Sequence, residues 1–173
     1  MFVLGEKALI ELLKEFVRCY HTSLRIIILG GVALQMHGWP DRITLDLDAE
    51  VRGDLESLIT FLNHHHIPAD LSENIFRWSI VAMPPGYVER SQIVYQDTNL
   101  TVGILSPVDL IVSKLRRGTD IDMEDCLFLQ KRYFLSNEEI ARAVDAAVKA
   151  SVKDTALLQF KKIAHTFLGS VIS

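Results

Sequence analysis

The chain has 173 residues, of which 49% are hydrophobic and 23% charged, and its formal net charge at pH 7 is -4. A chain of this length and apolar content can bury a substantial core, which excludes a disordered protein. The strands and helices predicted along the chain give an α/β (α+β) fold. The negative net charge excludes broad electrostatic binding of nucleic acid. Any RNA contact would need a local basic patch, for which Lys114, Arg116 and Arg117 are the candidates.

No segment has the properties of a membrane span or a secretion signal. The longest apolar run, around residues 26–34, is about half of the roughly 20 residues that a span requires, and glycines interrupt it. Charged residues interrupt the N-terminal segment, and no A-x-A-like cleavage site follows it. Cys19 and Cys126 are far apart in the sequence and predict reduced thiols that pack in the core. We therefore expect a cytoplasmic protein without membrane contact, and the oligomeric state stays open.

The first predicted elements place a glycine turn between a strand and a helix. Apolar residues at helical spacing predict a helix over residues 5–20, and the β-branched run at 26–29 predicts a strand. Gly30-Gly31 ends this strand, and a short helix is expected to follow. Such a turn leaves unpaired backbone N–H groups at a helix N-terminus, where a phosphate is favoured. A Rossmann dinucleotide site and a P-loop are not supported, because the sequence contains neither glycine-rich motif.

Two carboxylates lie on the next predicted strand. Apolar and polar residues alternate between residues 43 and 51, a period of two that predicts a half-buried strand with Asp46 and Asp48 on one face. Residues at this spacing stand roughly 6.5–7 Å apart along a strand, so one divalent ion could lie between them. Mg²⁺ (or Mn²⁺) is the candidate, because it is usually held by one or two carboxylates together with substrate phosphates. The alternative is a solvated strand face.

Further strands and one more helix are predicted in the middle of the chain. Asp54 is expected to cap a helix that ends at His64-His65-His66. Three successive histidines point to different sides of a helix end, so we predict a solvated turn there rather than a metal site. The remaining strands are predicted at residues 78–83, 92–95 and 100–105.

The C-terminal third predicts four helices, which begin near Ser106, Asp122, Ser136 and Thr155. Asp122 and Asp125 are expected to cap the second of these helices and to pair with Arg116 or Arg117. We expect a core domain over residues 1–118 and a helical C-terminal extension over residues 119–173, packed on the same unit.

Several of these residues together resemble the active-site signature of the polymerase-β-like nucleotidyltransferase superfamily. The signature residues are Gly30-Gly31-x-Ala33, His37-Gly38 and Arg42-x-Thr44-x-Asp46-x-Asp48. Downstream, Ser106-Pro107-x-Asp109-Leu110-x-x-x-Lys114-Leu115 and Asp122-x-x-Asp125 resemble the minimal bacterial members, both DUF6036-type proteins and the toxin components of abortive-infection systems. The resemblance covers about residues 24–132. It implies a nucleotidyltransferase-like mixed β-sheet flanked by helices.

The resemblance also implies roles for individual residues. Asp46 and Asp48 would be catalytic and hold the metal, and Gly30 and Gly31 would receive the triphosphate. Arg42, Thr44 and Lys114 would assist nucleotide binding; an unliganded Lys114 would pair with Asp46 or Asp48. The superfamily uses a third carboxylate on a later strand to activate the acceptor hydroxyl. The predicted strand at residues 78–83 carries no acid, and Glu89 is the candidate to stand in.

The sequence thus predicts a metal-dependent nucleotidyltransferase that transfers NMP from an NTP to a hydroxyl group on RNA or protein. A role in a toxin–antitoxin or phage-defence system follows from the resemblance alone. The alternative is a catalytically weak or inactive relative that binds nucleotide or a cognate partner protein. Its motivation is the acid missing from residues 78–83, because an aspartate pair without a general base would still bind nucleotide.

Overall fold

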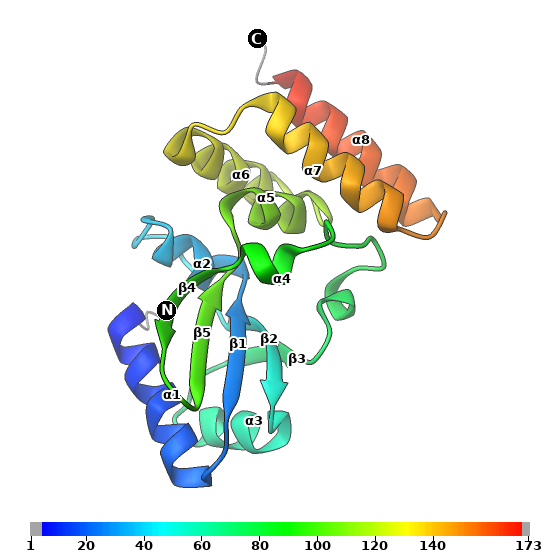
Figure 1. Cartoon of the computed structure of the whole chain (residues 1–173). Coiled ribbons are helices and arrows are strands. Elements are labelled where there is room, and N and C mark those ends of the chain that lie inside the picture. The colour runs from blue at the N-terminus through cyan, green and yellow to red at the C-terminus, as the bar shows by residue number, and fades with distance from the viewer. Residues whose placement is uncertain (1–4, 171–173) are drawn as a thin grey trace. The chain divides into compact units, whose positions relative to one another are not determined.

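The computed structural model describes residues 5–170, which form a mixed α/β fold with one five-stranded sheet (Figure 1). The strands are β1 (Leu24–Ile28), β2 (Leu47–Gly53), β3 (Ala69–Ser72), β4 (Gln92–Gln96) and β5 (Leu100–Ile104). Their order in the sheet is β3-β2-β1-β5-β4. Pairs β1–β5 and β2–β3 are parallel, and pairs β1–β2 and β4–β5 are antiparallel. The predicted mixed sheet flanked by helices is confirmed.

The helices alternate with the strands at first and then follow one another. They are α1 (Glu6–Tyr20), α2 (Gly30–Met36), α3 (Leu55–His64), α4 (Tyr87–Arg90), α5 (Pro107–Leu115), α6 (Asp120–Tyr133), α7 (Asn137–Ala150) and α8 (Thr155–Ser170). A 3₁₀ helix, η1 (Ile75–Trp78), follows β3. None of the helices in the described part of the chain is both long and apolar enough to cross a membrane.

The chain folds as two compact units. The sheet unit comprises the described part of Met1–Asn74 together with Ser91–Leu105, and so contains the whole sheet with α1, α2 and α3. The helical unit comprises Ile75–Arg90 and the described part of Ser106–Ser173, and so contains η1, α4 and the last four helices. The first long helix after the sheet, α5, therefore belongs to the helical unit, whereas the expected boundary at residue 118 had grouped it with the core.

The core of the sheet unit forms around β1. Its apolar run is buried, with Ile26 and Ile28 fully inaccessible, because β1 has a hydrogen-bonded neighbour on each side. Helices α1 and α3 pack together through Phe16 and Phe61, whose ring centroids lie 5.4 Å apart. Burial of such side chains contributes about 1.5–3 kcal/mol each. The core thus fixes the position of β1, and β1 in turn positions the Gly30-Gly31 turn that follows its C-terminal end.

The aspartate strand is shorter than the alternation predicts. Leu47, Ala49 and Val51 are fully buried as expected, but Ile43 and Leu45 are 61% and 76% exposed. Strand β2 begins only at Leu47, so residues 43 and 45 have no core face to occupy. Asp46 consequently lies in a bend just before the strand rather than within it.

The strand predicted at residues 78–83 is wrong. Trp78 ends η1, and the segment that follows is irregular, although Val81, Ala82 and Met83 are buried. This stretch is apolar because it packs in the helical unit, where Ala82 donates its backbone N–H to Ser151 Oγ at 2.8 Å. An apolar run of this length does not distinguish a buried strand from a buried loop. The strand that the prediction missed is β3.

The helix ends in the C-terminal half follow the predicted capping residues. Ser106 caps α5, with Pro107 in its first turn, and accepts a hydrogen bond from the Asp109 backbone N–H at 3.2 Å. Ser136 and Glu139 form a complete capping box at the start of α7. Such caps satisfy N–H groups that have no partner within the helix and typically contribute about 1 kcal/mol each. The predicted end of the last helix, at residue 171, lies outside the described residues.

Candidate active site

The glycine turn after β1 lies directly against the aspartate strand. Gly30 has φ +65°, a conformation that L side chains rarely adopt, and a Cβ atom there would lie 2.0 Å from Asp48 Oδ2. Glycine is therefore required at position 30 for two reasons: the backbone has a positive φ, and the Asp48 carboxylate occupies the space that a Cβ atom would need. The Leu29 backbone N–H also donates to the Asp48 carbonyl oxygen at 2.9 Å. The predicted phosphate turn and the predicted metal ligand are thus in contact.

The second glycine makes room for the loop that precedes the strand. A Cβ atom on Gly31 would lie 2.6 Å from both Cβ and Oγ1 of Thr44, a side chain that is nearly buried. Thr44 Oγ1 donates to the Asp46 carbonyl oxygen at 3.1 Å, which fixes the loop one residue before β2. Gln35 of α2 binds the Arg42 carbonyl oxygen at 2.7 Å, and the Arg42 guanidinium donates to the Ile43 carbonyl. The structure therefore brings Gly30, Gly31, Thr44 and Asp48 together.

A third carboxylate lies on the strand beside β2. Asp70 of β3 is the direct register partner of Asp48 in a parallel pair. In-register residues of adjacent strands share a face, and the strands run about 4.8 Å apart. Both side chains are half-buried. The predictions missed Asp70, because its strand is only four residues long and follows a proline, so its sequence carries no strand signal of its own.

The donor set of this site suits a hard divalent cation only in part. Among residues 5–170, no group of three or more His, Cys, Asp or Glu side chains is placed to hold a metal ion. Asp46 and Asp48 can supply carboxylate oxygens, which Mg²⁺ prefers, but a full octahedral shell would need oxygens from substrate or water. The residues present therefore fit a metal that arrives with a triphosphate better than a permanently bound one.

Lys114 lies in a buried ion cluster of the helical unit. Its ammonium nitrogen is 2.7 Å from Asp125 Oδ2 and 3.5 Å from Asp122 Oδ1, and its side chain is 6% exposed. The expected partners of the unliganded lysine, Asp46 and Asp48, belong to the sheet unit. Its contact with a triphosphate oxygen stays a prediction.

Asp122 and Asp125 have structural roles, as expected, but only one has the expected partner. Asp122 completes the capping box of α6 with Thr119 and binds Arg117 Nη2 at 2.6 Å. Burial alone would raise the pKa of Asp122, but hydrogen bonds from Arg117 and Thr119 hold that pKa below its usual value. Asp125 pairs with Lys114 rather than with an arginine.

The predicted basic patch at Lys114, Arg116 and Arg117 holds one well-exposed cation, Arg117, whose side chain is 67% exposed. Lys114 is buried, and Arg117 is bound to Asp122. Arg116 donates through Nη2 to the carbonyl oxygens of Ile75 and Ser79, at 3.2 and 3.0 Å, and burial lowers its pKa to about 10. Two of these three cations are thus engaged largely inside the helical unit, and a contact of Arg117 with an RNA phosphate backbone stays a prediction.

The remaining candidate residues have separate positions. Glu89 is exposed on the short helix α4 of the helical unit, so nothing in its own surroundings marks it as a general base. His37 is buried and its Nε2 lies 2.9 Å from the Leu105 carbonyl oxygen, and burial lowers its pKa. It ties the end of α2 to the end of β5. Cys126 is buried and its pKa is raised by burial, whereas Cys19 is exposed, contrary to its predicted packing.

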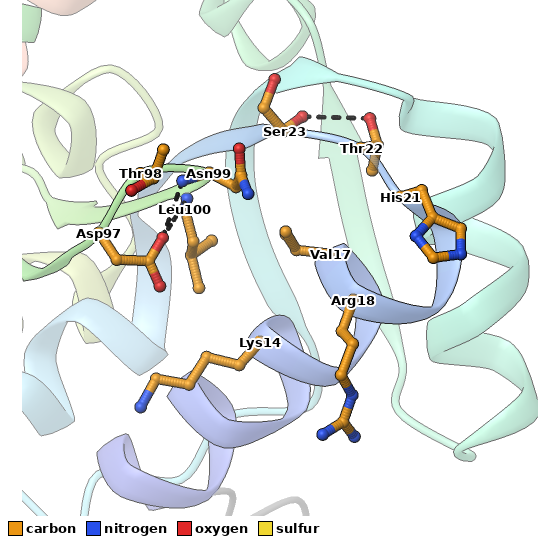
Figure 2. Close-up of a pocket in the computed structure, with 10 residues that line it drawn as sticks. All are labelled: Lys14, Val17, Arg18, His21, Thr22, Ser23, Asp97, Thr98, Asn99 and Leu100. Carbon is orange, nitrogen blue, oxygen red and sulfur yellow. Dashed lines mark hydrogen bonds between the residues drawn. The ribbon is translucent and has the colours of Figure 1, made fainter.

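An open groove of about 850 Å³ lies away from these residues, at the N-terminal end of β1 (Figure 2). Lys14, Arg18 and His21 line it from α1 and the residue after it. Asp97 also lines it, but this carboxylate accepts hydrogen bonds from the Asn99 and Leu100 backbone N–H groups, as Figure 2 shows. The glycine turn follows the opposite end of β1, so this groove is not part of the candidate active site.

Comparison with known proteins assigns the chain to a family. The family model described as "Nucleotidyltransferase of unknown function (DUF6036)" matches residues 7–160, so the chain belongs to this family. The resemblance to DUF6036-type nucleotidyltransferases is thereby confirmed. No curated protein matches the chain. Among solved structures, an antigenic nucleotidyltransferase-like protein from Paracoccidioides brasiliensis aligns over 87% of this chain and 95% of that chain, with 15% identity and a TM-score of 0.46.

Proposed function

We propose that this DUF6036 family member binds a metal–NTP complex at the glycine turn and transfers NMP to a hydroxyl group on RNA or protein. The observation that carries the proposal is the contact between Gly30 and Asp48, because any larger residue at position 30 would displace the carboxylate. A glycine turn offers backbone N–H groups to phosphate, and the adjacent carboxylate offers oxygen to the metal that accompanies it.

Each residue of the site has a defined task in this proposal. Gly30 and Gly31 receive the triphosphate, assisted by Arg42 and Thr44, while Asp46 and Asp48 hold the metal. A divalent metal there would neutralise charge on the entering and leaving oxygens. The acceptor oxygen forms a new bond to the α-phosphorus, and the bond from that phosphorus to the bridging oxygen breaks, so that pyrophosphate leaves.

Asp70 is the residue that takes the proton of the acceptor hydroxyl in this proposal. Its register position beside Asp48 supports the role, because a general base must lie within hydrogen-bond reach of the proton that it removes. It replaces Glu89 as the candidate third carboxylate. The alternative of a catalytically weak relative was motivated by the absence of an acid at residues 78–83. The register position of Asp70 beside Asp48 supports the enzyme over that alternative.

Calorimetry with Mg²⁺ and each NTP tests the binding step. We expect NTP and Mg²⁺ to bind together and only weakly apart, because each supplies the charge that the other needs. Asp46→Asn should abolish the metal-dependent part of binding. Unchanged NTP affinity after chelation of the metal would contradict the proposal.

The cellular context is also proposed. NTP substrates and the free thiols of Cys19 and Cys126 suit the reducing cytoplasm. Membership of a toxin–antitoxin or phage-defence pair rests on the resemblance to abortive-infection toxins, and a cognate partner protein would then bind the chain. Growth arrest on expression, relieved by Asp46→Asn, would test this role.

A further inference from the structure

The Ser106-Pro107-x-Asp109 motif positions a buried carboxylate that has no role in the proposed nucleotide transfer. Asp109 is fully buried, and its Oδ2 and Oδ1 accept hydrogen bonds from Arg90 Nε at 3.0 Å and Nη2 at 2.8 Å. Ser106 Oγ also donates to Asp109 Oδ2 at 2.6 Å. The motif therefore builds a fixed carboxylate whose main partner is the Arg90 guanidinium.

Arg90 is held further by the turn that precedes α4. Its Nη1 donates to the Pro85 carbonyl oxygen at 2.9 Å and its Nη2 to the Pro84 carbonyl oxygen at 3.3 Å. Gly86, with φ +83°, permits this approach, since a Cβ atom there would lie 2.9 Å from Nη1. Guanidinium donors all point outward in the plane of the group. These contacts engage four of the five guanidinium N–H groups, so one N–H of Nη1 and the flat face of the guanidinium remain for another molecule.

That guanidinium lines a cavity of about 320 Å³ within the helical unit. The Arg90 side chain is 43% exposed although four of its five N–H groups are engaged. The other lining residues are largely apolar or small, namely Pro84, Pro85, Val108, Leu135, Ala143 and Ala146. A volume of this size lies at the lower end of the range for small-molecule sites, which is about 300–1,000 Å³. A rigid guanidinium plane in an apolar cavity is a stacking surface for an aromatic ring.

Two charged side chains of α7 complete the lining. Arg142 provides hydrogen-bond donors, and Glu139 provides carboxylate oxygens, one of which accepts from the Ser136 backbone N–H at 2.8 Å. The Ser136 contacts hold the pKa of Glu139 below its usual value, so it is an acceptor at neutral pH. With Asp109 balancing Arg90, the lining carries no net charge. It suits an uncharged ligand that has both a donor and an acceptor on its edge.

We propose that this cavity binds a planar aromatic ring with an amide-like edge, stacked on the Arg90 guanidinium and bonded at its edge by Arg142 and Glu139. Nucleobases and nicotinamide-type rings have this chemistry. The site lies wholly within the helical unit and requires neither metal nor triphosphate. It can therefore be tested independently of nucleotide transfer.

Benzamide and cyclohexanecarboxamide form the matched pair of probes, because they share the carboxamide and differ in the planarity of the ring. Each is titrated into the full chain without Mg²⁺, and the methyl NMR signals of Ala143, Ala146 and Val108 are followed. We expect benzamide to shift these signals with a Kd of about 1 mM and cyclohexanecarboxamide to bind at least tenfold more weakly. Equal binding of the two amides, or no shift with benzamide at several times that concentration, would overturn the proposal.

Ala146→Leu fills the cavity, and Ala150→Leu is the control on the same helix outside its lining. Leucine is a good helix former, so both variants should keep the fold, which the melting temperature checks. We expect Ala146→Leu to weaken benzamide binding at least tenfold and Ala150→Leu to leave it unchanged. Arg142→Gln should weaken it less. Binding that survives Ala146→Leu unaltered would place the ring elsewhere and refute the site.

Discussion

At the scale of single residues, the candidate site depends on the absence of a Cβ atom at Gly30 and at Gly31. Gly30 leaves free the space that the Asp48 carboxylate fills, and Gly31 leaves free the space beside Thr44. Sequence alone could suggest that the glycines and aspartates belong to one site, because only one short helix and one loop separate the glycine turn from the aspartate strand in the chain. It could not show the contact between Gly30 and Asp48, which depends on the register of β1 with β2.

Replacement of Gly30 by alanine should destabilise the protein and abolish nucleotide binding. The positive φ alone costs a non-glycine residue about 1–3 kcal/mol, and the new Cβ atom would displace Asp48 as well. Denaturant unfolding measures the loss of stability. Gly169→Ala is the matched control, because a Cβ atom there meets nothing within 4 Å and helix propensity favours alanine by up to about 1 kcal/mol. Equal effects of both substitutions would contradict the packing described for Gly30.

Asp122→Asn should lower stability at neutral pH and have no effect at strongly acidic pH. Because the pKa of Asp122 is lowered in the folded state, its charge stabilises the fold above the unfolded pKa of about 3.8. That stabilisation is lost as the pH falls through the folded pKa. Breaking a buried ion pair costs about 3–5 kcal/mol of folding free energy. We expect a smaller loss here, because Lys114 still pairs with Asp125 after the substitution. Unfolding free energies of both proteins between pH 7 and pH 2 check this, and a constant difference across the range would contradict it.

At the scale of elements, the sequence predicts best where local signals are strong. The β-branched run of β1, the glycine turn and the capping residues Asp54, Ser106 and Ser136 all lie where they were expected. Two predictions failed for the same reason: strand β3 was missed, and a strand was predicted after Trp78 where the chain is irregular. In both segments the conformation is determined by tertiary contacts rather than by local sequence. Ala69–Ser72 extends because it pairs with β2, and the apolar stretch after Trp78 stays irregular in the helical unit. Local propensity does not contain this information.

The position of β3 leads to a prediction about the third carboxylate. Asp70→Asn should reduce NMP transfer about 10²–10⁴-fold, the usual contribution of a general base, while NTP binding changes little. Glu89→Gln is the control, because Glu89 was the candidate from sequence and lies on α4 of the helical unit. Rates of label transfer from NTP measure both variants. A large loss in Glu89→Gln with none in Asp70→Asn would reverse the assignment.

At the scale of the whole molecule, the chain combines a sheet unit that carries the nucleotidyltransferase signature with a helical unit organised by buried ion pairs. Composition and periodicity predicted this mixture of strands and helices, with the exceptions of β3 and the irregular segment after Trp78. The division into two units groups α5 with the last helices, whereas the predicted boundary at residue 118 grouped it with the core. The family match over residues 7–160 spans both units. We therefore expect the proposed activity to require both units.

Metal-dependent label transfer is the most direct test of this account. The intact chain is incubated with radiolabelled NTPs, Mg²⁺ and total RNA or cell lysate, and label covalently attached to RNA or protein is measured. The account predicts transfer that requires Mg²⁺ and disappears when Asp46→Asn and Asp48→Asn are combined. Transfer at background level in the unsubstituted chain, with Mg·NTP binding intact, would contradict the enzymatic claim and leave a nucleotide-binding protein.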